Sequence, residues 1–209
     1  MTERGRPRRF ERDVALDKAM RLFWRKGFTA TSISDLCEAI GITAPSLYAA
    51  FGSKEDLYAE ALGHFQTATR SRIWDCVEEK PTAREAFEGF LLASADALPA
   101  QGTPGGCMIT LSAVAGEGSA RLGEMVCQAR ALGLSALEAR LDRAVAEGEL
   151  PPEIEKTAIA RFYLSVQQGM SIQARDGATA EDLRLIARSA MAGWDGLTHK
   201  AAPDAGPAR

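Results

Sequence analysis

The spacing of Gly41 and Gly52 between residues that start helices constrains the fold of this chain most strongly. Ser32, Thr43 and Ser53 are helix-capping residues, and an aspartate three positions after each serine completes the spacing of a capping box. Because glycine readily adopts the left-handed conformation that ends a helix, each glycine closes one helix shortly before the next cap. The pattern predicts two short helices joined by a three-residue turn that begins at Gly41.

Helical patterning extends over most of the remaining sequence, and alternating β-branched runs are absent. Breaks rich in glycine and proline separate the helical segments. Besides the short pair, the expected helices are 13–26, 54–79, 83–98, 108–115, 119–147, 153–175 and 179–197. With 209 residues, of which 46% are hydrophobic, the chain can build a sizeable core. The predicted fold class is all-α, with about nine helices.

Charge is distributed unevenly along the chain, although the formal net charge is only −3. Residues 1–56 hold ten Lys and Arg against eight Asp and Glu, and the remainder holds 15 against 20. Basic residues dominate the first dozen positions, where Arg6, Arg8 and Arg9 lie. A basic arm on an acidic body favours a polyanionic partner at this end, although a solvated tail explains the arm equally well by itself.

The second helix of the short pair carries the functional hypothesis. In a helix-turn-helix, this helix enters the major groove of DNA with its N-terminus first. Small, flat and hydroxyl-bearing side chains let it approach base edges and phosphates. The expected DNA-binding residues here are Thr43, Ala44, Pro45, Ser46, Tyr48 and Ala49, with Thr31, Ser32 and Lys54 at neighbouring helix starts. The alternative is a plain helical hairpin with Tyr48 in the core, but the caps, the small residues and the basic arm together favour DNA binding.

Residues 23–33 (FWRKGFTATSI) and 39–57 (AIGITAPSLYAAFGSKEDL) resemble the N-terminal domain of the tetracycline-repressor (TetR) family of regulators. The resemblance is dense over residues 13–62, and Gly106–Cys107 is similar to a short motif of one subgroup. It implies an omega-shaped homodimer of nine-helix subunits, in which three N-terminal helices read DNA and the others bind an effector and dimerise. It also implies a repressor that a small molecule releases from a palindromic operator.

The resemblance assigns roles within the DNA-binding region. Base-facing positions match Thr43, Ala44, Ser46 and Ala49, and phosphate-contacting positions match Thr31, Tyr48 and Lys54. Arg6, Arg8 and Arg9 match no fixed motif, and we expect them to reach the DNA backbone or the adjacent minor groove. Ala49 and Ala50 stand where the family often has larger side chains. Base readout is therefore expected to depend on few side chains, on the arm and on DNA shape.

Apolar stripes on the last pair of predicted helices suit a four-helix dimer interface, which is where the family dimerises, although a core role is the ordinary alternative for each residue. The expected interface residues are Phe162, Val166, Met170, Leu183, Ile186, Ala190, Met191 and Trp194. Bulky aromatic residues and methionines elsewhere suit a broad apolar ligand pocket, or simply the core. The expected pocket lining is Phe65, Trp74, Phe87, Phe90, Met108, Leu111, Met125 and Phe162.

The four cysteines and two histidines are widely spaced, without a CxxC pair, so we expect no metal site and no cofactor. Cys107 follows two glycines and is expected to begin a helix, where a thiolate is stabilised. Oxidation, alkylation or soft-metal binding at Cys107 is an alternative trigger for release from DNA. Burial as a small core residue is the more common role of a cysteine.

Other function classes leave features of the sequence unexplained. No phosphate-binding loop, HExxH motif or nucleophile with an evident base argues for an enzyme, and His64 is expected to be an interhelical polar residue. A helical adaptor without DNA binding would leave the basic arm unexplained. No membrane span or secretory signal is evident, so we expect a cytoplasmic protein. The expected domains are 1–52 for DNA binding and 53–198 for ligand binding and dimerisation, followed by a disordered tail, 199–209.

Overall fold

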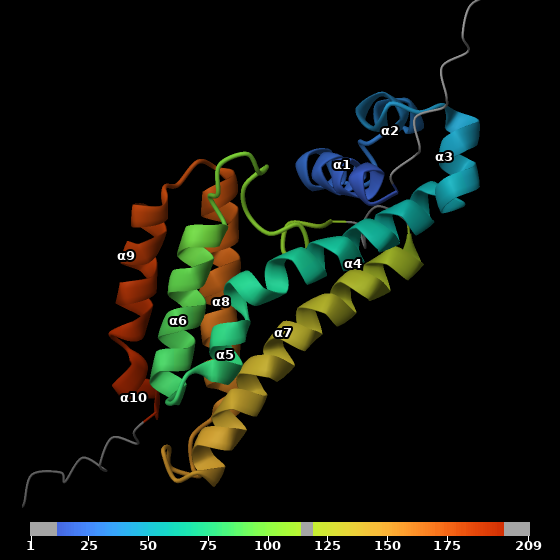
Figure 1. Cartoon of the computed structure of the whole chain (residues 1–209). Coiled ribbons are helices and arrows are strands. Elements are labelled where there is room, and N and C mark those ends of the chain that lie inside the picture. The colour runs from blue at the N-terminus through green and yellow to red at the C-terminus, as the bar shows by residue number, and fades with distance from the viewer. Residues whose placement is uncertain (1–11, 114–118, 199–209) are drawn as a thin grey trace, which may run out of the picture.

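The computed structural model describes residues 12–113 and 119–198. These two ranges hold ten helices and no strand (Figure 1), which confirms the predicted all-α fold class. The helices are α1 (Arg12–Lys26), α2 (Ile33–Ile40), α3 (Ala44–Phe51), α4 (Lys54–Ile73), α5 (Asp75–Glu79), α6 (Ala83–Ala97), α7 (Ala120–Ala146), α8 (Lys156–Arg175), α9 (Ala180–Met191) and α10 (Trp194–Thr198). No helix in these ranges has both the length and the apolar composition needed to cross a bilayer. Arg6, Arg8, Arg9 and the predicted tail lie outside the described residues.

Local capping explains why the short N-terminal helices form where the sequence predicts them. The Ser32 hydroxyl accepts a hydrogen bond from the Asp35 backbone N–H at 3.0 Å, and the Asp35 carboxylate accepts one from the Ser32 backbone N–H at 2.9 Å. Gly41 ends α2 at a φ of 86°, a left-handed conformation that favours glycine. Ile42 then packs back against the core, which positions α3 at an angle to α2.

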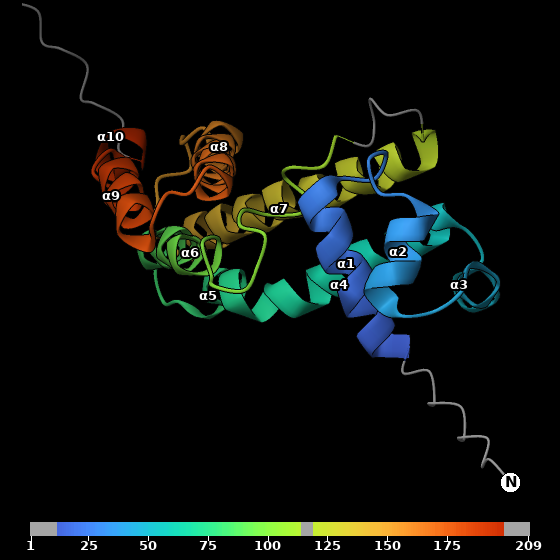
Figure 2. The ribbon, with the colours of Figure 1, turned by 90° about the horizontal axis from the view of Figure 1, so that it is seen from above.

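The helices form two groups connected by α4 and α7. Helices α1, α2 and α3 gather at one end and α6, α8, α9 and α10 at the other, while α4 and α7 run side by side between them (Figure 1, Figure 2). Each group has its own hydrophobic core. The first core includes Leu57 and Tyr58 of α4 together with Leu122 and Val126 of α7. The packing of the N-terminal group of helices therefore extends beyond residue 52, and the predicted division into domains stays a prediction.

Three predicted helices differ from the observed ones. The segment 54–79 is divided at Trp74 into α4 and α5, and the segment 179–197 is divided between Met191 and Trp194. Residues 108–111 form turns instead of starting a helix at Met108. The Arg130 guanidinium donates hydrogen bonds to the backbone carbonyls of residues 109, 110 and 112 at 2.7 to 3.2 Å. A continuing helix would need these carbonyls as acceptors for its own backbone N–H groups.

Candidate nucleic-acid interface and ligand cavity

Helix α3 presents a solvent-facing surface at the far end of the molecule from α9 and α10 (Figure 1, Figure 2). Leu47 and Phe51 anchor the opposite side of the helix in the first core, where they are 0% and 4% exposed. Tyr48 is 47% exposed, so the alternative that places its ring in the core is wrong. The other exposed residues of this surface are Thr43, Pro45, Ser46 and Ala49, and Ala44 is half-buried.

Two hydroxyls at the start of α3 are available to an external partner. Thr43 occupies the N-cap position with extended backbone, but its hydroxyl makes no capping hydrogen bond. It lies 3.0 Å from the Ser46 hydroxyl, and both side chains are exposed. Pro45 in the first turn has no N–H to leave unsatisfied. The helix start thus offers hydroxyl groups and orphan N–H groups, the combination that binds anions and base edges.

The residues expected to contact phosphates differ in their surroundings and in their exposure to solvent. Ser32 is exposed at the start of α2. Lys54 lies at the start of α4, with its ammonium 4.4 Å from the centre of the Phe28 ring. Thr31 is fully buried and its hydroxyl donates to the Gly27 carbonyl at 2.6 Å, so the expected contact of this side chain with a phosphate is wrong. The hydroxyl of a threonine that follows a turn can donate a hydrogen bond to a backbone carbonyl of that turn instead of facing solvent.

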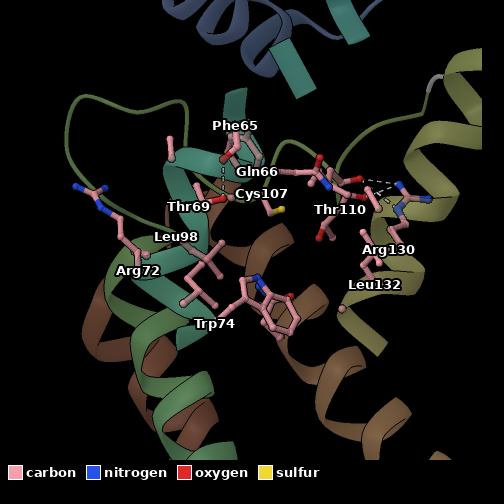
Figure 3. A pocket seen from close by; sticks show the side chains of 18 of the residues that line it. Phe65, Gln66, Thr69, Arg72, Trp74, Leu98, Cys107, Thr110, Arg130 and Leu132 are labelled. Carbon is pink, nitrogen blue, oxygen red and sulfur yellow. Dashed lines mark hydrogen bonds between the residues drawn. The ribbon is translucent and has the colours of Figure 1, made fainter. Parts of the chain in front are cut away.

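A cavity of about 310 Å³ lies between the two groups of helices, bounded by α1, α4, α5, α7, α8 and the loop after α6 (Figure 3). Of the expected lining residues, Phe65 and Trp74 border it. Phe87 and Phe90 are fully buried in the second core, Met108 is buried in the first and Met125 packs against it, so their expected role in lining this cavity is wrong. Met108 and Leu111 border a separate hollow, and Phe162 is 43% exposed on α8 and lies outside both hollows.

Residues that sequence reasoning missed complete the cavity wall. Helix α1 contributes Asp17, Met20, Arg21 and Trp24, and three glutamines line the cavity from α4 and α8, namely Gln66, Gln167 and Gln168. The polar face of α1 is a solvent-facing pattern in the sequence, and only the approach of α4, α7 and α8 turns part of it toward a cavity. No local signal in the sequence indicates this juxtaposition.

Most charged groups at the cavity are paired within the protein. Arg21 binds Asp17 at 2.8 Å and the Gly102 carbonyl at 2.8 Å. Arg130 is held by the carbonyls of the turn at 109–112, as the dashed lines in Figure 3 show. His64 lies 3.9 Å from Asp17, which agrees with the expected interhelical polar role.

Polar contacts connect the N-terminal group of helices directly to the body. The Arg175 guanidinium at the end of α8 donates to the Trp24 carbonyl at 2.8 Å and to the Gly105 carbonyl at 3.1 Å. Desolvation of this guanidinium lowers the pKa of Arg175. The Tyr58 hydroxyl on α4 also lies 2.9 Å from the Ser112 hydroxyl in the loop after α6. Movement of the loop near Gly105 is therefore mechanically connected to α1.

Cys107 lines the cavity but does not begin a helix, so that expectation is wrong. The two preceding glycines have φ values of 80° and 68°, and the Cys107 backbone N–H donates to the Ser171 hydroxyl at 2.7 Å. Figure 3 places the sulfur of Cys107 between Gln66 and Thr110 on one side and Trp74 on the other. Within the part of the chain that the structure describes, no cluster of three or more His, Cys, Asp or Glu side chains could hold a metal ion.

Most of the expected dimer-interface residues are covered within the subunit. Met170, Leu183, Ala190, Met191 and Trp194 are buried in the second core, so their expected interface role is wrong. Helix α9 packs mainly on α6, and α8 packs on α7, α9 and α6.

The outer surface of these two helices still carries large apolar side chains. Phe162 and Leu185 are 43% and 54% exposed, and Val166 and Ile186 on the same two helices are half-buried against the second core. Isolated exposed apolar residues are ordinary, but several on one pair of helices suit contact with a partner.

Comparison with known proteins relates the chain to regulators of transcription. Residues 15–61 match the family described as bacterial regulatory proteins, tetR family. The Escherichia coli K12 transcriptional repressors ComR and BdcR are 38% and 31% identical, over 93% and 90% of each chain respectively. A solved cysteine mutant of the TetR family regulator CifR, in complex with a 26-base-pair operator DNA, has a TM-score of 0.85 and 34% identity, and covers 91% of this chain and 100% of that one.

Proposed function

This chain belongs to the TetR family of bacterial transcriptional regulators, and we propose that it is a homodimeric repressor that a small molecule releases from a palindromic operator. The exposed surface of α3, with Tyr48, Thr43 and Ser46 outward and Leu47 anchored beneath, is the observation that carries this proposal. Its site of action is the cytoplasm, where bacterial DNA lies, and we propose no catalytic activity for it.

DNA recognition by this protein begins with the N-terminus of α3 in the major groove. Thr43, Ser46 and Ala49 face the bases, while Tyr48, Lys54 and Ser32 hold the flanking phosphates. Because α3 carries no charged residue, hydrogen bonds from hydroxyls and contacts of small side chains supply direct readout. The arm at Arg6, Arg8 and Arg9 adds contacts to the backbone or the minor groove.

The experiment that tests DNA binding is a gel-shift titration with the intergenic DNA beside the encoding gene. We expect Tyr48→Phe, which removes only the hydroxyl, and Lys54→Gln, which removes only the charge, to weaken binding to all sequences. Loss of the Lys54 charge should also reduce the salt slope by about one. Lys80→Gln, at an exposed lysine after α5, is the matched control and should bind like the wild type. If Tyr48→Phe and Lys54→Gln both retard the DNA like the wild type, the proposed orientation of α3 on DNA is contradicted.

Release by a ligand follows from the position of the cavity. Its wall combines α1 residues with α4, α7 and α8, so an occupant alters how the DNA-binding end sits on the body. A ligand that prefers a dimer with wrongly spaced recognition helices lowers operator affinity by a shift of populations.

Thiol chemistry at Cys107 is the alternative trigger, favoured by the position of this residue in the cavity wall. Addition of the Cys107 sulfur to the double bond of N-ethylmaleimide forms a C–S bond, and the thiol proton ends on the neighbouring carbon. We expect this adduct to release the operator in the wild type and not in Cys107→Ser. Cys127→Ser, which removes an exposed thiol outside the cavity, is the control and should still respond. An equal response of both variants would rule out Cys107 as the trigger.

A further inference from the structure

Uncharged hydrogen-bonding groups of the cavity wall are left without a protein partner. Gln167 lines the cavity and is only 5% exposed, yet its side-chain amide has no hydrogen-bond partner among the described residues. The Trp24 indole N–H is also buried without a partner in this part of the chain, and Trp24 borders the same cavity. An amide that lines a cavity without a protein partner can pair with a bound ligand, so Gln167 is the candidate hydrogen-bonding residue of this wall.

Two arginines of the cavity wall are already committed to protein partners. Arg21 is shared by Asp17 and the Gly102 carbonyl, and Arg130 is held by backbone carbonyls. Arg72 is exposed, and Figure 3 shows it directed away from Trp74 and Cys107. A carboxylate beside Trp74 and Cys107 would therefore lose its hydration without gaining an adjacent available cation.

Aromatic rings form one part of the apolar wall, beside aliphatic side chains. The Trp24 and Phe65 rings pack edge to face with centroids 5.0 Å apart, and Trp74 borders the cavity from the junction of α4 and α5. Trp74 lies against Gly133, where a Cβ would come within 2.9 Å of the ring, so glycine allows α7 and the indole to approach closely. Such rings favour stacking or edge contacts with a planar ligand.

We propose that this cavity binds an uncharged aromatic molecule that bears a carbonyl oxygen, with the Gln167 amide N–H as the donor to that oxygen. The partly buried amides of Gln66 and Gln168, which have no partner among the described residues, provide further uncharged hydrogen bonds from the same wall. This proposal rests on the proposed function in that the molecule is the effector, but binding itself is measurable without DNA.

Three probes that share one ring system separate the ring from its polar group. Methyl 2-naphthyl ketone carries the neutral carbonyl, 2-naphthoate carries a charge, and naphthalene carries neither. Isothermal titration calorimetry with the full chain is expected to give a Kd for the ketone at least about tenfold lower than that for naphthoate. Tighter binding of naphthoate, or no binding of the ketone, would overturn the proposal.

Variants of two glutamines identify the hydrogen-bonding residue. Gln167→Leu keeps the bulk of the side chain and removes its amide, so we expect affinity for the ketone to fall about five- to tenfold while affinity for naphthalene is unchanged or rises. Gln128→Leu, at an exposed position on α7 outside the cavity, should bind both like the wild type. Equal ketone affinity of Gln167→Leu and the wild type would overturn the role of Gln167.

A gel shift with the same preparations tests the proposed ligand class separately from the proposed repressor function. Operator binding without ketone binding would refute the ligand class and leave the proposed repressor intact. Ketone binding without any effect on the operator complex would refute the effector role while the binding site stands.

Discussion

At the scale of single residues, Gly106 is the position where the backbone of the cavity loop approaches α8 most closely. A Cβ on Gly106 would lie 2.5 Å from the Ser171 carbonyl oxygen, and the residue has a φ of 68°. Gly102 shares the positive φ, at 76°, but a Cβ there would meet nothing within 4 Å. The two glycines therefore separate the cost of the backbone conformation from the cost of the close approach.

Substitution of these two glycines tests the close approach. Gly102→Ala is expected to lower the free energy of unfolding by about 1–2 kcal/mol, because only left-handed strain is added. Gly106→Ala adds the overlap with Ser171 and should cost at least about 1–3 kcal/mol more. Urea titration at one fixed protein concentration measures both values. Equal losses would mean that the loop moves freely away from α8.

Asp35 makes the α2 capping box sensitive to acid. Hydrogen bonds from the Ser32 backbone, from Lys26 and from the Ser32 hydroxyl lower the pKa of this carboxyl from 3.8 to about 2. A carboxyl whose pKa is lower in the folded state contributes stability above its unfolded pKa, and this is lost as pH falls through the folded pKa. The contribution of Asp35 is therefore lost between about pH 4 and pH 2.

Thermal unfolding between pH 5 and pH 2 tests this titration. We expect Asp35→Asn to melt at a lower temperature than the wild type at pH 5, and the difference to shrink toward pH 2. Ser34→Ala, an exposed change on the same helix, controls for effects on α2 itself. A constant difference across this range would show that the charge of Asp35 does not stabilise the cap.

At the scale of helices, Arg175 joins the end of α8 to the end of α1. The last carbonyls of a helix lack partners within the helix, and a cation near them is favourable. The guanidinium satisfies the Trp24 carbonyl and also holds Gly105, so one side chain links α1, α8 and the cavity loop.

Removal of this link should loosen both segments together. Arg175→Ala is expected to lower the free energy of unfolding by about 1–3 kcal/mol and to increase hydrogen exchange of the amides at residues 24–28 and 103–107. Arg161→Ala, at an exposed arginine on the same helix, should exchange like the wild type. Faster exchange in only one of the two segments would argue against a shared link.

Elements that depend on nearby residues were predictable from the sequence. Capping residues and left-handed glycines lie within a few positions of the helices that they start or end, so the bounds of α2 and α3 are evident from the local sequence. Trp24 and Gln167 line the same cavity, and no local pattern in the sequence indicates that two residues so far apart share one wall. Periodicity likewise identifies Leu183 and Trp194 as belonging to a buried face, but it does not say whether α6 or a second subunit covers that face.

At the scale of the whole molecule, a two-fold dimer would present two α3 helices about 34–36 Å apart, or a multiple of that distance, to match successive turns of the major groove. The exposed Phe162 and Leu185 on α8 and α9 are the side chains we assign to the interface that sets this spacing. Because they lie outside the second core, they can be changed without opening a cavity in it.

Charge placed on this surface should separate the subunits. We expect Leu185→Glu to sediment as a monomer at micromolar concentration and to lose at least about tenfold in operator affinity, since a buried unpaired carboxylate is costly. Val14→Glu changes an equally exposed apolar residue on α1 and should sediment like the wild type. A dimeric Leu185→Glu would place the interface elsewhere.

The four α1 residues in the cavity wall have a consequence for the DNA end of the molecule. Thermodynamic linkage is reciprocal. The factor by which the ligand lowers the affinity of the protein for the operator is also the factor by which the operator lowers its affinity for the ligand. Because α1 belongs both to the DNA-binding end and to the wall, docking on DNA can change the shape of the cavity without a relay through the remainder of the protein. The operator is then itself a regulator of the sensor, and a subunit bound at its gene is harder to trigger than one free in the cell.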